Sequence, residues 1–370
     1  MTDLTPVPAV AEDAGKTGIL VDREHALMRL TLDRPLARNA LTRAMKRGIA
    51  EAISRCGNDP EIYAIALDSS SPGAFCGGAE LADFIDAPKR LNEILAIQAE
   101  ETRLLWQIEC CIKPSVALID GLVMGSGAGL SMFCTHRVAS ENYSFGMPET
   151  GRGWFPGAGA THFLGRMPDS VGIYLGMSGA RVGRSDAYAL GLVTHCIDGR
   201  HFDAIRAGLA DADPIDPLLD ERHEPQGEGG LMKLRPVIAR CFGWETVEEI
   251  VAALEAVTAE ARPWAQAALG ELSRRSPSSL KLALRQFHSA ANMDLKAALE
   301  TEFRMMAHCL ALPDFMEGVR VTLIDKGAPP RWQPPTLAEV TPAMVAAIFT
   351  PAAERDLVLP PRPQRLVALS

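Results

Sequence analysis

Short apolar runs alternate with amphipathic segments through the first two hundred residues of the chain. Residues 19–21 and 26–32 are apolar runs separated by a polar turn, which predicts two short strands. Apolar residues then recur at helical spacing over 43–56, and Thr42 directly before them is a suitable N-cap. The pattern therefore predicts a pair of strands followed by a helix.

The same order recurs in the next segment. Residues 63–67 are a continuous apolar run that predicts a buried strand, and residues 91–110 have a long helical pattern. A further apolar run at 114–119 predicts the next strand. Repeated strand-then-helix units with glycine-rich turns predict an α/β core, whose sites lie where strands end and helices begin. We assign residues 17–210 to this core.

The pattern changes beyond about residue 180. Residues 211–230 are rich in Pro, Asp, Glu and Gly, which predicts an exposed loop or boundary. Residues 231–335 form a predicted helical region that packs through amphipathic stripes against the core or another subunit. Its predicted helices cover residues 246–259, 263–275, 276–291, 294–312 and 313–325. The proline-rich residues 336–370 are expected to follow the surface as extended segments.

Composition and charge exclude several classes of function. The chain has 370 residues, of which 47% are apolar, so it can bury a substantial core. Its net charge of −9 provides no basic surface for nucleic acid or an anionic membrane, and no apolar stretch is long enough to span a bilayer. Residues 1–16 contain acids and no arginine, which predicts a disordered tail rather than a targeting segment.

The cysteines and histidines predict no metal site. The eight cysteines include no CxxC pair, which argues against zinc binding and dithiol redox chemistry. Small buried thiols in a reducing cytoplasm are the expected arrangement. The eight histidines show no ligand spacing, and we expect His195 to be a packed side chain.

Two glycine-rich turns predict a site that binds negative charge. The apolar run at 114–119 is followed by Gly-Ser-Gly-Ala-Gly at 125–129, and an upstream turn reads Ala-Phe-Cys-Gly-Gly-Ala-Glu-Leu over 74–81. A strand that turns through glycines into a helix directs unpaired backbone N–H groups at one point. Two such turns can hold one oxygen atom from two sides.

A carboxylate follows the second turn. Glu149 lies in Met-Pro-Glu at 147–149, ahead of Gly-Ala-Gly at 157–159. A carboxylate beside two N–H donors can move protons or attack a carbonyl group while the donors hold the oxyanion. The combination therefore predicts acyl chemistry. An exposed turn residue after Pro148 is the alternative for Glu149, and the two glycine turns favour the site.

These motifs resemble those of the crotonase (enoyl-CoA hydratase/isomerase) superfamily over roughly residues 17–335. The resemblance is most detailed for the 3-hydroxyisobutyryl-CoA hydrolase branch and includes a longer helical C-terminal region. Its points of similarity are residues 100–101, 113–114, 145–150, 155–156, 241–242, 276–281 and 331–332. It implies an α/β fold, a crotonase-like spiral of repeated strand-strand-helix units with a C-terminal helical region, and an acyl-CoA thioester as substrate.

The resemblance also implies roles for individual residues. The oxyanion donors would be the backbone N–H groups of Ala79 and Ser126, and Glu149 would be the catalytic carboxylate. The substrate-binding residues would be Glu101, Gly78, Gly125, Gly157 and Arg38. Glu101 could alternatively lie on a solvated helix face. Arg38, with the nearby Arg34, would meet the phosphates of CoA or serve a surface role. Ser126 replaces a usual glycine, which is tolerable because the donor is backbone.

Two glycines depart from the motifs that the resemblance suggests. Hydratases of the superfamily carry a second catalytic glutamate at the position of Gly129, so water addition that needs two carboxylates is disfavoured. The hydrolase branch carries an aspartate at the position of Gly157, so half of its catalytic pair is missing here.

Three functions therefore remain open. The first is thioester hydrolysis, with Glu149 attacking the carbonyl group or activating water. The second is isomerisation, with Glu149 alone moving a proton between C2 and C4 of an enoyl-CoA through a thioester enolate. The third is acyl-CoA binding without turnover. No metal or redox cofactor is implied, and CoA enters as part of the substrate. We expect a monomer or small homo-oligomer in the cytoplasm, without nucleic-acid or membrane partners.

Overall fold

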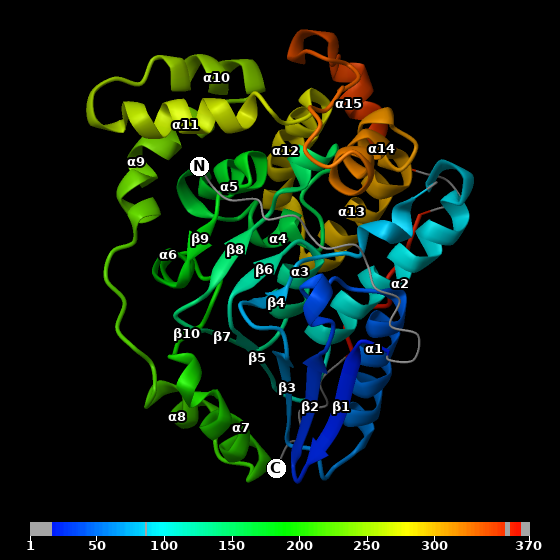
Figure 1. Cartoon of the computed structure of the whole chain (residues 1–370), viewed down its shortest axis with the longest axis vertical. Helices are drawn as coiled ribbons and strands as arrows, with labels where there is room; N and C mark the ends of the chain where they lie inside the picture. Colours follow the sequence, from blue (N-terminus) through cyan, green and yellow to red (C-terminus); the bar gives the residue numbers. More distant parts are fainter. Residues whose placement is uncertain (1–16, 86, 352–355, 364–370) are drawn as a thin grey trace.

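The structure is a computed structural model that describes residues 17–85, 87–351 and 356–363 (Figure 1). The tail expected over residues 1–16 lies outside the described residues. In the described part of the chain, the principal strands form two sheets.

The two sheets differ in size and in the way their strands pair. In the larger sheet β1 and β2 are antiparallel, with Ile19 opposite Leu32, and the other neighbours are parallel. In spatial order it comprises β1 (Ile19–Glu24), β2 (Leu27–Leu32), β3 (Ala64–Ser69), β5 (Ser115–Ile119), β7 (His136–Ala139) and β10 (His195–Cys196). The smaller sheet comprises β4 (Ala74–Cys76), β6 (Leu122–Met124), β8 (Ser144–Gly146) and β9 (Val182–Gly183). The strands expected at 19–21, 26–32, 63–67 and 114–119 are all present.

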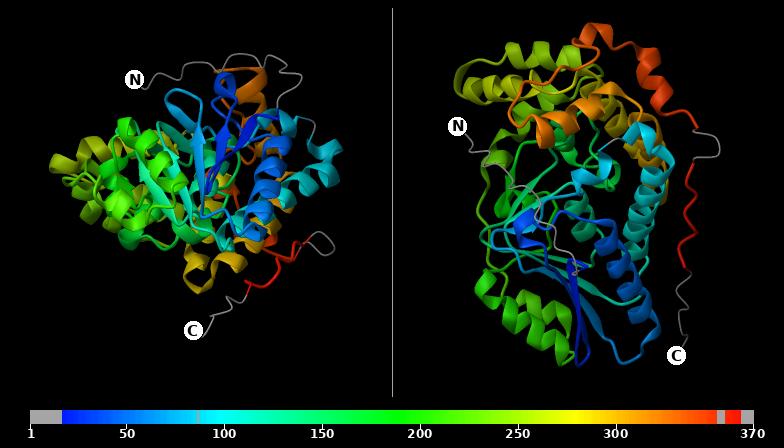
Figure 2. Two further views of the ribbon diagram at one scale, coloured as in Figure 1. Left: turned by 90° about the horizontal axis from the view of Figure 1, so that it is seen from below. Right: turned by 45° about the vertical axis from the view of Figure 1, so that its right-hand side comes forward.

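The larger sheet is buried on both faces, which explains why its central strands are continuous apolar runs. Leu30, Ile65 and Ala117 belong to the main core, whereas the alternate residues Ala66 and Val116 belong to a second core on the other face. Helices cover each face, as Figures 1 and 2 show. Those that follow the early strands are α1 (Arg43–Asn58), α2 (Leu91–Glu109), α3 (Ser126–Met132), α4 (Ala160–Phe163), α5 (Val171–Ser178), α6 (Arg184–Ala189) and α7 (Phe202–Ala210).

Capping confirms the predicted start of α1. The Thr42 side chain accepts a hydrogen bond from the Met45 backbone N–H at 3.2 Å. Short 3₁₀ turns connect several elements, at Pro35–Ala37, Leu81–Phe84, Ala87–Lys89, Glu149–Arg152, Pro168–Ser170, Gly199–His201, Ala259–Ala261, Ala290–Asn292 and Leu337–Glu339. Glu80 caps the second of these through a bond from Ala82 N–H, as expected for an acid at a helix start.

The prediction of a loop over 211–230 is wrong for the first part of this segment, which contains the helix α8 (Ile215–Asp220). Ile215, Leu218 and Leu219 are buried in the second core beside α7. These three apolar residues have helical spacing, and their burial outweighs the surrounding Pro and Asp residues that suggested a loop. Irregular structure follows α8 over residues 221–229.

The helices expected in the C-terminal region are present, and the structure places them together at one end of the molecule (Figure 1). They are α10 (Val247–Glu255), α11 (Arg262–Leu272), α12 (Pro277–Ser289), α13 (Leu295–Cys309) and α14 (Pro313–Val319), followed by a π-helical turn at Arg320–Ile324. A further helix, α9 (Gly230–Phe242), precedes them in the region predicted to be helical. Thr246, Ser276 and Asp294 cap α10, α12 and α13. The α12 helix packs on α5, and α13 packs on α2 and α4, so these helices lie on the chain's own core.

The proline-rich segment beyond residue 335 also differs from the expected extended structure. It forms the helix α15 (Pro342–Ile348), which Thr341 caps and which buries Val345 and Ile348. The last described stretch, 356–363, contains neither helix nor strand. An amphipathic turn with a capping threonine therefore outweighs the high proline content, since Pro342 lies in the first turn, where proline fits a helix.

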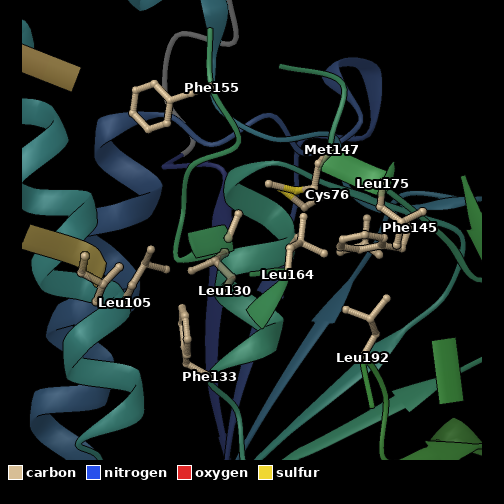
Figure 3. Close-up of a cluster of buried hydrophobic side chains, with 14 of the residues drawn as sticks. Cys76, Leu105, Leu130, Phe133, Phe145, Met147, Phe155, Leu164, Leu175 and Leu192 are labelled. Atoms are coloured by element: carbon tan, nitrogen blue, oxygen red, sulfur yellow. The ribbon is translucent and has the colours of Figure 1, made fainter. Parts of the chain in front are cut away.

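The eight cysteines are free thiols, of which six are buried and Cys110 and Cys111 are half-buried. Part of the main core is shown in Figure 3, which includes Leu130 of α3, Phe133 at the end of that helix, and Cys76. Within the described parts of the chain, no helix combines the length and apolar character needed to cross a bilayer.

Candidate active site

Three neighbouring strands of the smaller sheet bring the predicted site together. The strands β4, β6 and β8 are adjacent and parallel. Their carboxyl ends therefore lie along the same edge of the sheet, where sites of open α/β sheets form. The turn at Gly78 follows β4, the turn at Gly125 follows β6, and Glu149 follows β8. The tertiary structure thus places three segments that are distant in sequence side by side.

The two glycine turns touch each other. Gly78 has φ +105°, and a Cβ atom on it would lie 3.3 Å from Met124 O and 3.8 Å from Gly125 Cα. Gly125 has φ +50° and ψ −124°, a conformation that is favourable only for glycine. Both positions therefore require glycine, because the backbone adopts a left-handed conformation where two turns approach closely.

The two predicted oxyanion donors are the backbone N–H groups of Ala79 and Ser126. Neither takes part in the hydrogen bonds of the bridge or helix in which it lies. Leu41 N–H donates to Gly78 O at 2.8 Å, and Glu80 N–H donates to Leu41 O at 3.2 Å. This parallel bridge uses the neighbours of Ala79, so the N–H of Ala79 itself points to the other side. Ser126 is the first residue of α3, where an N–H has no intrahelical acceptor. Within the described residues we find no hydrogen-bond acceptor for either N–H group.

The Glu149 carboxylate lies beside these donors. A Cβ atom on Gly125 would be 2.9 Å from Glu149 Oε1, so the carboxylate is in contact with the turn that precedes Ser126. Glu149 is only 8% exposed. Its Oε2 atom is buried and has no hydrogen-bond partner among the described residues. A buried carboxylate oxygen without a partner is costly, which is typical of a functional group that awaits a ligand.

Burial also brings Glu149 into the range useful for proton transfer. Burial raises the pKa of Glu149 to about 7; the positive charges of Arg152 and Arg275 oppose this rise, and the negative charge of Glu302 adds to it. A group with such a pKa is ionised and protonated in similar amounts near neutral pH. The site can therefore hold an oxyanion at two N–H groups and can attack or move protons with one carboxylate.

The two glycines that depart from the family motifs have different surroundings. A Cβ atom on Gly129 would lie 2.7 Å from Ala158 O and 2.8 Å from Ala158 Cβ, so a glutamate cannot fit there without displacing the backbone. A Cβ atom on Gly157 would meet nothing nearer than Phe155 Cε2, at 3.9 Å. The structure therefore excludes a side chain at 129 but would accept one at 157.

Glu101 lies in the interior and not on a solvated helix face. Leu105 Cδ2 is 3.3 Å from the position of a Cβ atom on Gly129, and Glu101 precedes Leu105 by one turn of α2. Figure 3 shows Leu105 on the side of α2 that faces α3. The Glu101 carboxylate pairs with Lys46 of α1, with Nζ–Oε2 2.5 Å and the Lys46 side chain 2% exposed. Contact of Glu101 with a substrate stays a prediction.

This buried ion pair leads to a prediction about stability. Replacing Lys46 by methionine leaves the Glu101 charge buried and unpaired, which should lower the free energy of unfolding by about 3–5 kcal/mol. The double variant Lys46→Met with Glu101→Leu removes both charges and should recover most of that loss. Urea unfolding followed by circular dichroism measures both. A single variant within about 1 kcal/mol of the unmodified protein would contradict the prediction.

The two arginines near the first turn have different roles. Arg34 Nη1 donates to Glu80 Oε2 at 3.0 Å and to Ala40 O, so it holds the turn together. Arg38 is half-buried, has φ +49°, and accepts a hydrogen bond from Gly77 N–H at its carbonyl oxygen. Arg38 therefore directly supports the turn that carries Ala79. A contact with CoA phosphates stays a prediction.

Sequence reasoning missed three charged residues around the site: Lys46, Arg152 and Glu302. Lys46 and Glu302 are charged residues on the apolar, core-facing sides of α1 and α13. A charged residue in such a position is rarely buried without a partner or a function, and this signal is readable in the sequence. Arg152 follows Glu149 by three residues, and its proximity depends on the turn that the two share.

His195 is packed as expected, with Nδ1 2.9 Å from Thr194 Oγ1 and Nε2 3.1 Å from Asp220. Among the described residues, no group of three or more His, Cys, Asp or Glu side chains is arranged to hold a metal ion. A cavity of about 470 Å³ lies at the opposite end of α3, beside Phe133, Phe163 and Arg166. It is separate from the oxyanion turn, because α3 runs between them.

Comparison with known proteins identifies the family of this chain. The family model of enoyl-CoA hydratase/isomerase matches residues 27–349. 3-Hydroxyisobutyryl-CoA hydrolase 1 of Arabidopsis thaliana is 34% identical over 365 residues, covering 95% of this chain and 96% of the relative. The mitochondrial 3-hydroxyisobutyryl-CoA hydrolase of Xenopus laevis is 36% identical over 342 residues, covering 89% of this chain and 88% of the relative.

Two solved structures share the fold. A carnitinyl-CoA dehydratase from Mycobacterium thermoresistibile superimposes with a TM-score of 0.86 and 32% identity, covering 92% of this chain and 98% of that chain. An enoyl-CoA hydratase from Rhodobacter sphaeroides 2.4.1 gives the same TM-score and identity, covering 92% of this chain and all of the other (100%). The expected crotonase-like α/β fold with a C-terminal helical region is confirmed. The chain belongs to the enoyl-CoA hydratase/isomerase family.

Proposed function

We propose that this protein hydrolyses an acyl-CoA thioester, in the manner of a 3-hydroxyisobutyryl-CoA hydrolase. The observation that carries the proposal is the contact between the Glu149 carboxylate and Gly125, which precedes the unpaired Ser126 N–H. Relatives that align over nearly their whole length bear the name of this hydrolase, which supports the substrate class. CoA is part of the substrate, and no separate cofactor is needed.

In the proposed reaction the thioester carbonyl oxygen accepts hydrogen bonds from the N–H groups of Ala79 and Ser126. Ionised Glu149 either attacks the carbonyl carbon or removes a proton from an attacking water molecule. Negative charge develops on the carbonyl oxygen, and the two donors stabilise it. Collapse of this intermediate breaks the carbon–sulfur bond and releases CoA. When Glu149 is the nucleophile, water then cleaves the acyl-enzyme anhydride to release the acid.

Isomerisation is the second candidate, because Gly129 and Gly157 leave a single carboxylate on the motif positions. One carboxylate is sufficient to take a proton from C2 of a 3-enoyl-CoA and to return it at C4. The same two N–H groups would stabilise the intermediate enolate. The hydrolase is preferred because the hydrolase-named relatives align with the chain almost end to end, including its C-terminal region.

Two assays on the same enzyme preparation distinguish the candidates. Release of free CoA from 3-hydroxyisobutyryl-CoA is followed with a thiol reagent, and double-bond migration in a 3-enoyl-CoA is followed by absorbance. The proposal expects thiol release that depends on enzyme concentration. Isomerisation without thiol release would refute it in favour of the isomerase. CoA binding by calorimetry with neither activity would indicate a binding protein.

Gly157→Asp tests whether the absent second carboxylate limits the reaction. The position has room for a side chain, so the variant should fold, and hydrolysis should rise by about 10-fold or more because a positioned acid–base group is added. Gly157→Asn is the matched control, with the same size and no ionisable group, and should show no such gain. Thiol release that appears only in the aspartate variant would refute the hydrolase proposal for the natural sequence.

A further inference from the structure

The mechanism above does not use Glu302, one of several buried carboxylates outside the reaction. Glu302 lies in the middle of α13 and is only 3% exposed, on a helix face that otherwise consists mainly of apolar side chains such as Leu299, Phe303 and Met306. Burying a charged group is costly unless it is hydrogen-bonded. Its contacts therefore indicate why a glutamate is present there.

The Glu302 carboxylate holds a turn of the chain more than 140 residues away. Oε2 accepts a hydrogen bond from Gly159 N–H at 2.7 Å, and Oε1 accepts one from Thr161 N–H at 2.8 Å. A second buried side chain supports the same turn from α12, because Gln286 Nε2 donates to Pro156 O and to Thr161 Oγ1. Two helices of the C-terminal region, α12 and α13, thus bind residues 156–161 through buried hydrogen bonds.

This turn needs support from outside because its own backbone is unfavourable. Ala158 has φ +57° and Gly159 has φ +87°, so two successive residues adopt the left-handed conformation. A non-glycine residue in this region is strained by about 1–2 kcal/mol. Without the bonds to Glu302, the turn should relax into other conformations.

The turn packs directly on the helix that carries an oxyanion donor. A Cβ atom on Gly129 would lie 2.7 Å from Ala158 O, and one on Gly159 would lie 2.3 Å from Phe133 Cζ. These contacts extend along α3, whose first residue is Ser126. The turn also includes Gly157, the position at which the hydrolase branch that the chain resembles carries its aspartate. A shift of the turn should therefore move α3 and the wall of the site together.

Glu302 is also close enough to Glu149 to influence its charge. The negative charge of Glu302 adds to the effect of burial on the pKa of Glu149. Burial likewise raises the pKa of Glu302 to about 7, although the two N–H donors oppose the rise. The other charged groups in this region are the Lys46–Glu101 pair from α1 and α2, with Arg152 and Arg275 beside Glu149. His162 on α4 is titratable, and burial lowers its pKa.

We propose that Glu302 is a positioning residue of the active site, which fixes the turn 157–161 against α3 from the C-terminal helical region. The C-terminal helices would then be part of the catalytic apparatus and not only a cover for the core. The inference rests on catalysis at Glu149, as proposed above, but not on which of the two reactions is catalysed. It can fail while that catalysis is confirmed.

Glu302→Gln is the discriminating variant. Glutamine has the same shape but a single acceptor oxygen, so its NH₂ group must face one of the two backbone donors, whichever way the amide is turned. We expect kcat to fall by about 10- to 100-fold with a much smaller change in KM, because a small misplacement of the oxyanion helix is sufficient for such a loss. Amide hydrogen exchange over residues 156–163 should accelerate in parallel.

The pH profile separates positioning from a purely structural role. Removing the Glu302 charge should lower the pKa of Glu149, so the acidic limb of the kcat profile should move to lower pH. Glu302→Asp retains the charge with a shorter reach, and should lower kcat while leaving the acidic limb near that of the unmodified enzyme. It also serves as the second test if the glutamine variant does not fold.

Glu300→Gln is the matched control on the same helix. Glu300 pairs with Lys296 and accepts a bond from Leu359 N–H, so it contacts the C-terminal segment and not the turn. Its replacement should change neither kcat nor exchange over 156–163. A folded Glu302→Gln enzyme with unchanged kcat, acidic limb and amide exchange would overturn the inference. Absence of activity in the unmodified protein would instead refute the proposed function, and amide exchange would still test the contact.

Discussion

Glu149→Gln should reduce turnover by about 1,000-fold while leaving the fold intact. Glutamine has nearly the same volume as glutamate, and a neutral side chain removes the cost of burying a charge that has no hydrogen-bond partner at Oε2. It can neither attack a thioester nor accept a proton at neutral pH, so both candidate reactions should be lost together. Steady-state thiol release and calorimetric CoA binding measure the effect, with CoA affinity expected to change only a few-fold. Turnover within about 10-fold of the unmodified enzyme would exclude Glu149 as the catalytic group.

The pH dependence follows from the same residue. Glu149 must be ionised to act as nucleophile or base, and burial raises its pKa to about 7. Its ionised fraction therefore rises with pH through 7, and kcat/KM should follow the same curve. At pH 5 the rate should be about 100-fold below its plateau, since the pH is then two units below that pKa. A profile that is flat between pH 5 and 8 would contradict this assignment.

Gly125→Ala should be nearly as damaging as removal of the carboxylate. The added Cβ would lie 2.9 Å from Glu149 Oε1, and alanine is strained at φ +50° and ψ −124°. Both effects displace the Ser126 donor and the carboxylate from each other, so we expect kcat to fall by about 100- to 1,000-fold, the loss typical of one oxyanion donor. Ser126→Ala, by contrast, should retain activity within a few-fold, because the donor is backbone.

The control for glycine replacement in general is Gly57→Ala. Gly57 lies near the end of α1, where a Cβ atom would meet nothing within 4 Å. Alanine favours the helix there, so the melting temperature should stay constant or rise slightly. Thermal unfolding with parallel kinetics compares the two glycine variants. Equal kcat in Gly125→Ala and Gly57→Ala would show that the Gly125 turn has no catalytic role.

Local pattern was a reliable guide to elements but not to every segment. The caps at Thr42, Thr246 and Asp294 begin the helices that the periodicity indicates, because capping depends on only a few neighbouring residues. The helix α8 was missed because the composition of 211–230 concealed three apolar residues at helical spacing. Composition averages over a segment, whereas burial depends on which few residues face a neighbouring element.

Some features of the site likewise depend on the local sequence, and others depend on the tertiary structure. Glycines that permit a left-handed turn, and a glutamate after proline, are local features, so the sequence alone was sufficient to indicate an oxyanion site with a single motif carboxylate. The acyl-CoA substrate was implied by the resemblance of these motifs to the crotonase superfamily. The fold decided the rest. Only the parallel order β4–β6–β8 places the two turns and Glu149 at one edge. Only α13 brings Glu302 to Gly159 across the chain. The pKa of Glu149 likewise depends on burial and on charges from distant segments, and through-space effects of this kind arise only when the chain has folded.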